Sequence, residues 1–172
     1  MAPAKTLEDI RREQEEIAEN LRVVMQHMEM EGEDFDAVLE LYTDDVVWET
    51  PSRGQVLRTY DEIREAYRQM GASMFIRSRT LLRRFATDHW VVDESLWHVT
   101  LIDDKIPNLS YPVGTELSLR KLTLFEMRDG KICREINHTS YRPAGDPRLD
   151  HDDIPAEAFT AVAVAAPEPA SA

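Results

Sequence analysis

Residues 34–51 of the sequence read DFDAVLELYTDDVVWETP, and this stretch decides the fold. Its first half combines acidic residues that can cap a short helix with apolar side chains at helical spacing, which predicts a helix over residues 34–43. Its second half, from Val46 to Thr50, is rich in β-branched and aromatic residues and stops at Pro51, which predicts a strand. The stretch therefore places a short helix directly before a short strand.

Two further helices flank this stretch. Residues 6–30 carry apolar side chains at helical spacing, and Thr6 with Asp9 three positions later has the pattern of a capping box. Residues 60–71 form the other predicted helix, with these residues on one face: Ile63, Ala66, Tyr67 and Met70.

The hydrophobic period changes from 3.6 to two near residue 74. Four segments rich in β-branched and aromatic residues follow, and they predict strands at 75–86, 90–102, 116–127 and 131–141. The dipeptide Asp129-Gly130 is typical of a tight hairpin turn between the last two. Helices followed by a long run of antiparallel strands indicate an α+β domain rather than a βαβ fold.

The charge distribution argues against a nucleic-acid partner. The net charge of the 172 residues is −13. Residues 1–36 hold 11 acidic and 4 basic residues, and residues 143–172 hold 6 acidic and 1 basic, whereas residues 37–142 hold 16 acidic and 15 basic. The acidity therefore belongs to the two ends, and nucleic acid would require a basic face instead.

The sequence also indicates which cofactors and which cellular compartment to expect. Cys133 is the single cysteine, so no internal disulfide forms, and no zinc spacing or nucleotide motif predicts a metal or cofactor. No apolar run reaches the roughly 20 residues that span a bilayer, and the first residues lack the apolar segment of a secretory signal. We expect a cytoplasmic protein with one domain at residues 1–142, followed by an acidic, Ala/Pro-rich tail at residues 143–172.

Three segments carry a resemblance to a known family. Residues 34–51 resemble the opening of the ketosteroid-isomerase/SnoaL-like superfamily, residues 61–67 are similar to its next helix, and residues 129–132 are similar to its penultimate hairpin. The resemblance covers about residues 15–142. It implies a nuclear-transport-factor-2-like cone, in which a curved antiparallel or mixed sheet carries three N-terminal helices on its concave face. It also implies a pocket for a small molecule and a homodimer formed through the convex face.

The resemblance places polar but not acidic residues at the family's catalytic positions. The isomerases' general-base aspartate aligns with Thr50, and their oxyanion-binding aspartate aligns with about Thr123. The catalytic aspartate of the epoxide hydrolases aligns with Asn137. Steroid isomerisation by that mechanism is therefore not expected.

The sequence is compatible with two registers of the last hairpin. A three-residue loop at residues 128–130, the preferred reading, pairs Thr123 with Glu135 and Lys121 with Asn137. A two-residue loop at Asp129-Gly130 would instead pair Thr123 with Ile136 and Lys121 with His138. The resemblance identifies the odd-numbered face of the first register as the pocket.

That face predicts the site. Glu135 is the expected acid/base, with a pKa raised by burial, and Asn137 and Thr123 would orient a substrate oxygen. Residues expected to bind the substrate are Trp48, Thr50, Lys121, Phe125 and Tyr42. Weaker candidates for a part in the site are His27, His98, His138 and Cys133.

The leading hypothesis is a cofactor-independent enzyme of isomerase, cyclase or dehydratase type, using general acid/base chemistry on a small, mostly apolar, carbonyl- or hydroxyl-bearing substrate. The alternative is a non-catalytic domain of the same fold that binds a small ligand or associates with another subunit. The missing isomerase carboxylates favour this alternative, and lysine–glutamate pairing is the structural alternative for Lys121 and Glu135.

Overall fold

A computed structural model describes residues 5–31 and 34–145 of the chain. The elements are α1 (Leu7–Met30), α2 (Phe35–Leu39), β1 (Tyr42–Thr50), the 3-10 turn η1 (Pro51–Arg53), β2 (Gln55–Leu57), α3 (Tyr60–Ser73), β3 (Met74–Ala86), β4 (Trp90–Leu101), β5 (Glu116–Arg128) and β6 (Lys131–Pro143). The predicted α+β class and the order of its main elements are confirmed. The predicted tail at residues 143–172 lies outside the described residues from position 146 onward and stays a prediction.

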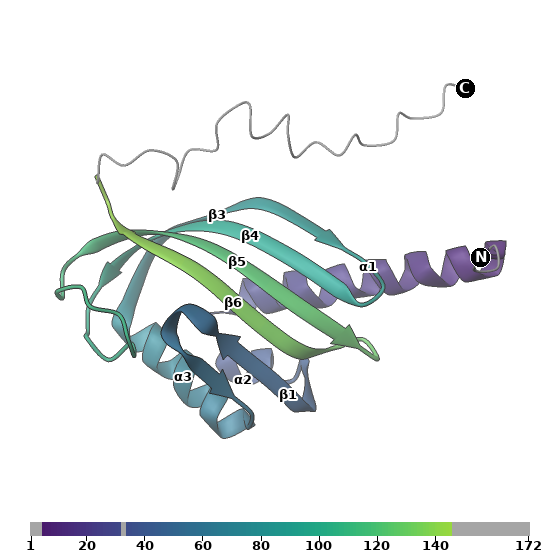
Figure 1. Cartoon of the computed structure of the whole chain (residues 1–172), viewed down its shortest axis with the longest axis horizontal. Coiled ribbons are helices and arrows are strands. Elements are labelled where there is room, and N and C mark those ends of the chain that lie inside the picture. The colour runs from purple at the N-terminus through teal and green to yellow at the C-terminus, as the bar shows by residue number, and fades with distance from the viewer. Residues whose placement is uncertain (1–4, 32–33, 146–172) are drawn as a thin grey trace.

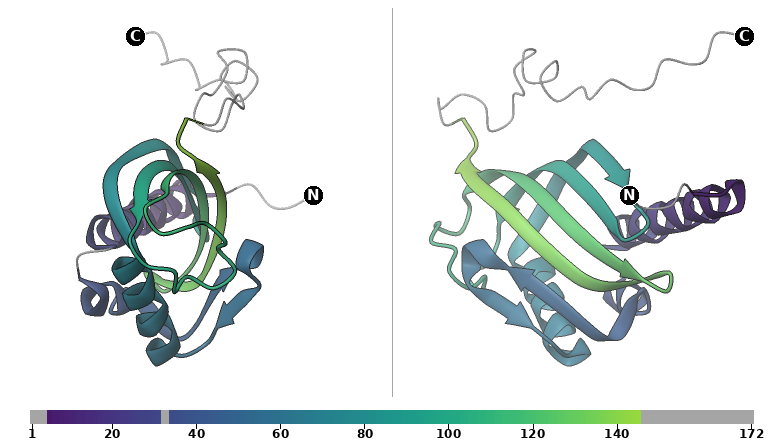
Figure 2. Two further views of the ribbon diagram at one scale, coloured as in Figure 1. Left: turned by 90° about the vertical axis from the view of Figure 1, so that its left-hand side faces the viewer. Right: turned by 45° about the vertical axis from the view of Figure 1, so that its right-hand side comes forward.

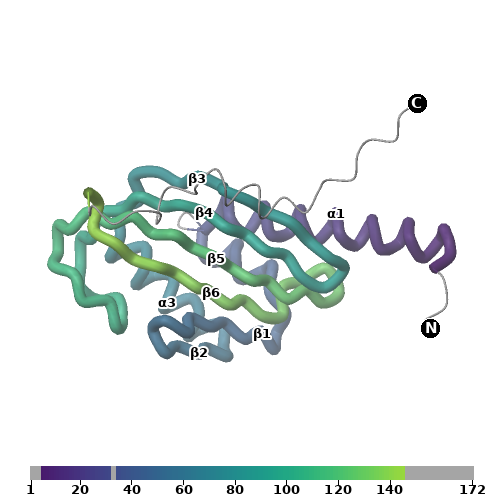
Figure 3. Tube along the Cα trace, turned by 45° about the horizontal axis from the view of Figure 1, so that its top comes forward, coloured from purple at the N-terminus to yellow at the C-terminus, as the bar shows by residue number. Residues whose placement is uncertain are grey.

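The six strands form one curved mixed sheet in the order β2-β1-β6-β5-β4-β3. Neighbours are antiparallel except for β1 and β6, which run parallel and close one side of the cone. Figure 1 and Figure 2 show the long strands wrapping around the helical side, and Figure 3 shows β2, β1 and β6 lying side by side. The nuclear-transport-factor-2-like cone with three helices is therefore confirmed.

The two long helices begin at capping boxes. Thr6 accepts a hydrogen bond from the backbone of Asp9, whose carboxylate accepts from the backbone of Thr6. Thr59 and Glu62 repeat this exchange at the start of α3. Each box satisfies backbone donors that have no partner inside the helix, and so positions the first turn.

The segment between α2 and β1 differs from its prediction. The helix ends at Leu39, and the strand begins at Tyr42 instead of Val46. Tyr42 pairs with Ile132 of β6, and the amide of Ile132 donates to the carbonyl of Leu41 at 2.9 Å. This parallel pairing, which joins distant parts of the chain, outweighs the local helical spacing. The short elements η1 and β2 were not predicted.

Both predicted registers of the last hairpin are wrong. The turn is the two-residue one, with φ values of 53° at Asp129 and 71° at Gly130, so Arg128 pairs with Lys131. A β-bulge then shifts the register by one, and Cys133 is left without a partner on β5. Beyond the bulge Thr123 pairs with Asn137, rather than with Glu135 or Ile136. The bulge restores Glu135 to the inner face.

The core consists of two apolar clusters between the helices and the inner face of the sheet. One contains Trp48, Tyr67 and Phe125 among its buried members, and the other contains Trp97 and Leu119. Among the described residues, no helix is both long and apolar enough to cross a membrane. A pocket opens where the two clusters meet, because its lining draws on both.

Candidate active site

A carboxylate lies at the centre of the polar residues in the core. Glu135 of β6 is fully buried, and its Oε2 accepts a hydrogen bond from the hydroxyl of Tyr42 on β1. The Tyr67 hydroxyl on α3 and His27 Nε2 on α1 each lie 3.2 Å from the same oxygen. The two tyrosine hydroxyls are 2.8 Å apart, and His27 Nε2 is 2.9 Å from that of Tyr42. Side chains from β1, α3 and α1 thus meet at one oxygen of a carboxylate that β6 carries.

The second oxygen of Glu135 continues the network along the sheet. Asn137 donates to Oε1 through its Nδ2 at 2.8 Å, and Thr123 donates to Asn137 Oδ1 at 3.1 Å. The ionised carboxylate of Glu135 can only accept hydrogen bonds, so the Nδ2 group of Asn137 must face it, and the Thr123 hydroxyl donates to the amide oxygen. One of the two hydrogens of this Nδ2 group remains available for another acceptor.

The electrostatics of Glu135 differ from the prediction. Burial by itself raises the pKa of its carboxyl, but His27, Lys121 and the hydrogen bond from Tyr42 outweigh burial and lower the pKa to about 2. The expected rise in the pKa of Glu135 is therefore wrong. Glu135 is an anion and a hydrogen-bond acceptor at neutral pH, not a proton donor.

Both tyrosines keep their protons in this environment. Burial and the nearby carboxylates of Glu135 and Glu31 raise the pKa of Tyr67 well above its usual value of 10. Burial, Glu135 and Tyr67 do the same for the pKa of Tyr42. Each hydroxyl therefore acts as a donor towards Glu135 or towards a ligand.

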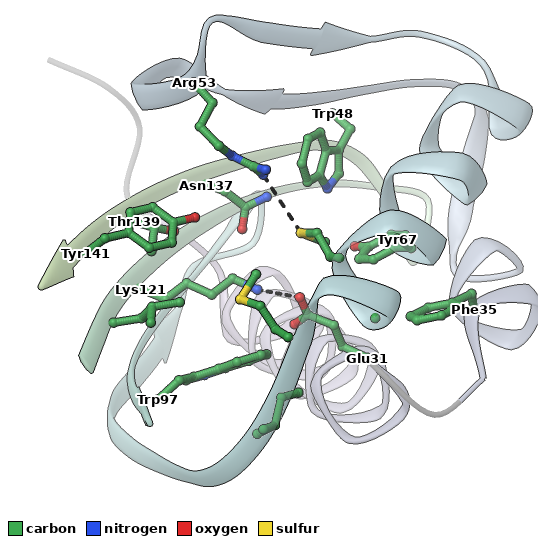
Figure 4. A pocket seen from close by; sticks show the side chains of 15 residues that line it. Glu31, Phe35, Trp48, Arg53, Tyr67, Trp97, Lys121, Asn137, Thr139 and Tyr141 are labelled. Atoms are coloured by element: carbon green, nitrogen blue, oxygen red, sulfur yellow. Dashed lines mark hydrogen bonds and ion pairs between the residues drawn. The ribbon is translucent and has the colours of Figure 1, made fainter. Parts of the chain in front are cut away.

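The pocket lies beside this network. Its mouth opens to solvent, and its walls include Trp48, Trp97, Met70 and Leu119. Tyr67 and Asn137, which both bind Glu135, also line the pocket, and Figure 4 shows their side chains on it. A mostly apolar cavity with a few convergent polar groups is typical of a small-molecule site.

The structure separates the sequence-predicted site residues into two sets. Trp48, Lys121 and Asn137 line the pocket. The other predicted residues lie buried behind that lining: Glu135, Thr123, Thr50, Phe125 and Tyr42. Glu135 can therefore act on a pocket ligand only through Tyr67 and Asn137.

Lys121 is paired with a residue that the sequence analysis did not consider. Its Nζ lies 2.5 Å from Glu31 Oε1, both side chains are buried, and the ammonium sits 4.8 Å from the ring centre of Trp97. The expected pairing of Lys121 with Glu135 is absent. Lys121 and Glu31 form a neutral pair in the pocket wall.

Tyr67 and Arg53 were missed as site residues by the sequence analysis. Tyr67 was assigned to the apolar face of its helix, where its hydroxyl was the only signal of a polar role. His27 occupies the same kind of position on α1 and was only a weak candidate. Arg53 gave no signal, because it follows a strand that ends at a proline and its burial depends on the path of η1.

The remaining weak candidates lie elsewhere. His98 Nδ1 is 3.2 Å from the hydroxyl of Ser118, and His138 is exposed. Cys133 sits in the bulge, where its thiol donates to the carbonyl of Glu126. Burial raises the pKa of the Cys133 thiol, which disfavours the reactive thiolate. Within the described ranges, no group of three histidine, cysteine, aspartate or glutamate side chains is placed to hold a metal ion.

Comparisons with known proteins identify the relatives of this arrangement. The family model described as a SnoaL-like domain matches residues 24–135. A search of curated proteins finds no match to the chain.

Solved structures with the same fold share little sequence with this chain. A Mycobacterium tuberculosis LEH-like epoxide hydrolase is 21% identical with a TM-score of 0.55, over 73% of this chain and 85% of that one. The epoxide hydrolase/cyclase-like enzyme SalBIII is 18% identical with a TM-score of 0.57, over 72% and 92%. An NTF2-like protein from Burkholderia xenovorans is 11% identical with a TM-score of 0.58, over 72% and 91%. At these identities the likeness is one of fold.

Proposed function

Because the chain belongs to the SnoaL-like domain family, we propose that it is a small-molecule enzyme that activates an oxygen atom of a small, mostly apolar, carbonyl- or hydroxyl-bearing substrate. One observation carries this proposal. Tyr67 and Asn137 line the pocket and are also hydrogen-bonded to the buried carboxylate of Glu135. Two oriented donors therefore meet a ligand at one end of an otherwise apolar cavity.

Tyr67 is the proposed general acid. Its hydroxyl can turn from Glu135 towards a substrate oxygen and donate its hydrogen there. A free phenolate at this position is costly, since burial and carboxylates raise the pKa of Tyr67. The transferred proton must therefore be replaced in the same step. His27 Nε2, 3.2 Å from the Tyr67 hydroxyl, would supply it directly or through the Tyr42 hydroxyl at 2.8 Å, and His27 would pass from its protonated to its neutral form.

Asn137 and Glu135 have supporting roles in this proposal. The second hydrogen of Asn137 Nδ2 is directed to the same substrate oxygen, so that two donors stabilise the charge that develops there. Glu135 holds both donors in place, and its carboxylate faces His27 Nε2 at 3.2 Å. This replaces the acid/base role that the sequence suggested for Glu135.

Protonating or polarising one oxygen is common to several reactions. Isomerisation through an enol, loss of a hydroxyl as water, and cyclisation onto an opened epoxide all need it, and the apolar walls exclude competing water. The structural neighbours include an epoxide hydrolase and an epoxide hydrolase/cyclase-like enzyme, which supports this range of chemistry.

A second candidate function is ligand binding without turnover. It is favoured by the saturation of Glu135, whose two oxygens already accept hydrogen bonds from four side chains. A carboxylate in that state is a poor base. The two candidates share a pocket and differ in whether Tyr67 transfers its proton.

The turnover rate of a Tyr67→Phe variant distinguishes the enzymatic function from ligand binding without turnover. Small β,γ-unsaturated ketones, β-hydroxyketones and aryl epoxides would be incubated with the protein and followed by NMR. If Tyr67 is the acid, Tyr67→Phe lowers kcat by a factor on the order of 10²–10⁴ while binding changes little. Tyr60→Phe is the matched control, because Tyr60 lies on the same helix and its hydroxyl bonds only the Tyr42 carbonyl and Asp44.

Two results would overturn the enzymatic proposal. One is a Tyr67→Phe variant with the wild-type kcat. The other is a panel whose members bind in the pocket without any product being formed, which supports the binding alternative instead.

A further inference from the structure

Arg53 is a buried cation without an acidic partner. Its side chain comes from η1 and lines the pocket, and the residue is only 5% exposed. Its Nη2 has two weak contacts, with Thr50 Oγ1 at 3.4 Å and Met70 Sδ at 3.8 Å, and its Nε has no hydrogen-bond partner. Across the described part of the chain, no carboxylate lies within ion-pair distance of Arg53. Figure 4 shows the guanidinium projecting towards Asn137.

Other buried cations of the protein are compensated. Buried Lys121 pairs with Glu31, and even the half-buried Arg84 pairs with Asp93, at 2.6 Å. A buried charge without a partner is destabilising, and an arginine cannot escape this by losing its proton. Arg53 is therefore an exception within this molecule.

The backbone around Arg53 fixes the point from which its side chain enters the pocket. Asn108 donates to the carbonyl of Arg53 at 2.6 Å, and Gly54, with a φ of 64°, closes the turn onto Pro51. The left-handed φ at Gly54 is one that glycine adopts without strain. The guanidinium itself has only weak contacts, so its hydrogen-bond donors remain available to a ligand.

The charge balance of the pocket has one positive charge in excess. The lining contains three ionisable side chains of fixed charge, and Lys121 and Glu31 cancel one another. The guanidinium of Arg53 is left over. Its Nε and Nη groups form a fork that matches the two oxygens of a carboxylate.

We propose that the ligand of this pocket is a carboxylate, whose acid group pairs with Arg53 while its apolar body lies between Trp48 and Trp97. This deepens the proposed function, on which it rests for the pocket, by naming the charge of the substrate. The reacting oxygen at Tyr67 and Asn137 then belongs to the same molecule, so the substrate is a carboxylic acid that also carries a carbonyl, hydroxyl or epoxide. The small, mostly apolar ligand that the sequence suggested is replaced by an amphipathic anion.

The test compares acids with their amides on the intact protein. Benzoate, cinnamate, 3-phenylpropanoate and hexanoate would be titrated by calorimetry at pH 7 beside the matched primary amides, which have the same shape but no charge. We expect at least one acid to bind tenfold or more tightly than its amide, since a hydrogen bond to a charged group contributes more than a neutral one. Equal affinity of every acid and its amide, or binding by none of the acids, overturns the proposal.

Variants locate the source of the preference. Arg53→Met removes the fork and should abolish the difference between acid and amide, whereas Arg53→Lys keeps the charge and should retain part of it. Arg58→Met is the control, because Arg58 is exposed and lies outside the pocket lining. A preference for the acid that survives Arg53→Met contradicts the assignment.

The two proposals fail separately. If acids bind through Arg53 but no hydroxy, keto or epoxy acid is turned over, the ligand class stands and the enzymatic role is wrong. If neutral ketones or epoxides are turned over in a Tyr67-dependent way and Arg53→Met leaves kcat/KM unchanged, the enzymatic role stands and the carboxylate proposal is wrong.

Discussion

The face of the sheet on which Glu135 lies could be predicted from the sequence, but its charge state could not. Strand alternation placed Glu135, Asn137 and Thr123 on the inner face, and the structure does bring them together there. The charge state of Glu135 was not accessible from sequence, because it depends on His27 and Tyr42, which are distant in the chain. Arg53 was missed for the same reason.

Replacing the carboxylate of Glu135 should reduce activity strongly. Glu135→Gln keeps the shape, but its amide nitrogen cannot accept the hydrogen bonds that orient Tyr67 and Asn137. We expect kcat for whichever substrate is found to fall by a factor on the order of 10²–10⁴. Glu126→Gln is the control, because Glu126 lies on the same hairpin and faces away from the pocket. Wild-type turnover by Glu135→Gln would contradict the role given to the carboxylate.

The lowered pKa of Glu135 predicts an acid-sensitive fold. The folded pKa of about 2 lies below the usual value of 4.5, so the ionised group stabilises the fold above pH 4.5, and this stabilisation is lost as the pH falls towards 2. A shift of this size corresponds to roughly 3 kcal/mol of unfolding free energy as an order of magnitude. Urea unfolding between pH 6 and pH 3 should show the loss in the wild type and a smaller one in Glu135→Gln.

At the scale of elements, the β-bulge in the last hairpin decides what the pocket contains. The turn Asp129-Gly130 is readable from sequence, but a two-residue turn without a bulge would direct Glu135 to the convex face. The extra residue, Cys133, reverses the alternation, so Ile132 and Glu135 both point inward. No local pattern marks a bulge, since it arises from the packing of β6 on β1 and β5 together.

Deleting Cys133 tests this role of the bulge. Without the extra residue, either Glu135 leaves the core or the turn must be rebuilt, so we expect the deletion variant to lose several kcal/mol of unfolding free energy or to fail to fold. Cys133→Ala keeps the bulge and should cost about 1 kcal/mol or less. Equal stability of the two variants would show that the chain repositions Glu135 without the bulge.

The whole molecule presents an apolar row on its convex side. Phe85, Val92, Leu124 and Ile136 are successive partners across β3, β4, β5 and β6. Phe85 is 56% exposed, and the other three are half-buried. Ile132, on the same strand as Ile136, is fully buried inside and does not extend the row. An antiparallel sheet normally faces water with polar side chains, so this row is the basis for the prediction that two copies associate.

A charge in the middle of the row should prevent that association. We predict that the wild type is a dimer at micromolar concentration in light scattering, and that Leu124→Glu is a monomer with an intact fold by circular dichroism. Leu81→Glu is a suitable control, because Leu81 is an exposed leucine of the same sheet, 53% exposed, and pairs with Ser95, away from the row. A monomeric wild type would contradict the prediction.

The order in which the chain folds follows from the closure of the sheet by β1 and β6. Tyr42 and Glu135 stand 93 positions apart, whereas short turns join β3 to β4 and β5 to β6. Closing so long a loop costs entropy before any contact compensates it, which makes this pairing the slow event in a chain of high contact order. During synthesis the carboxylate that organises the pocket emerges after His27, Tyr42 and Tyr67, and of its hydrogen-bond partners only Asn137 follows it. A ligand can therefore bind only the finished chain, and cannot assist earlier stages of its folding.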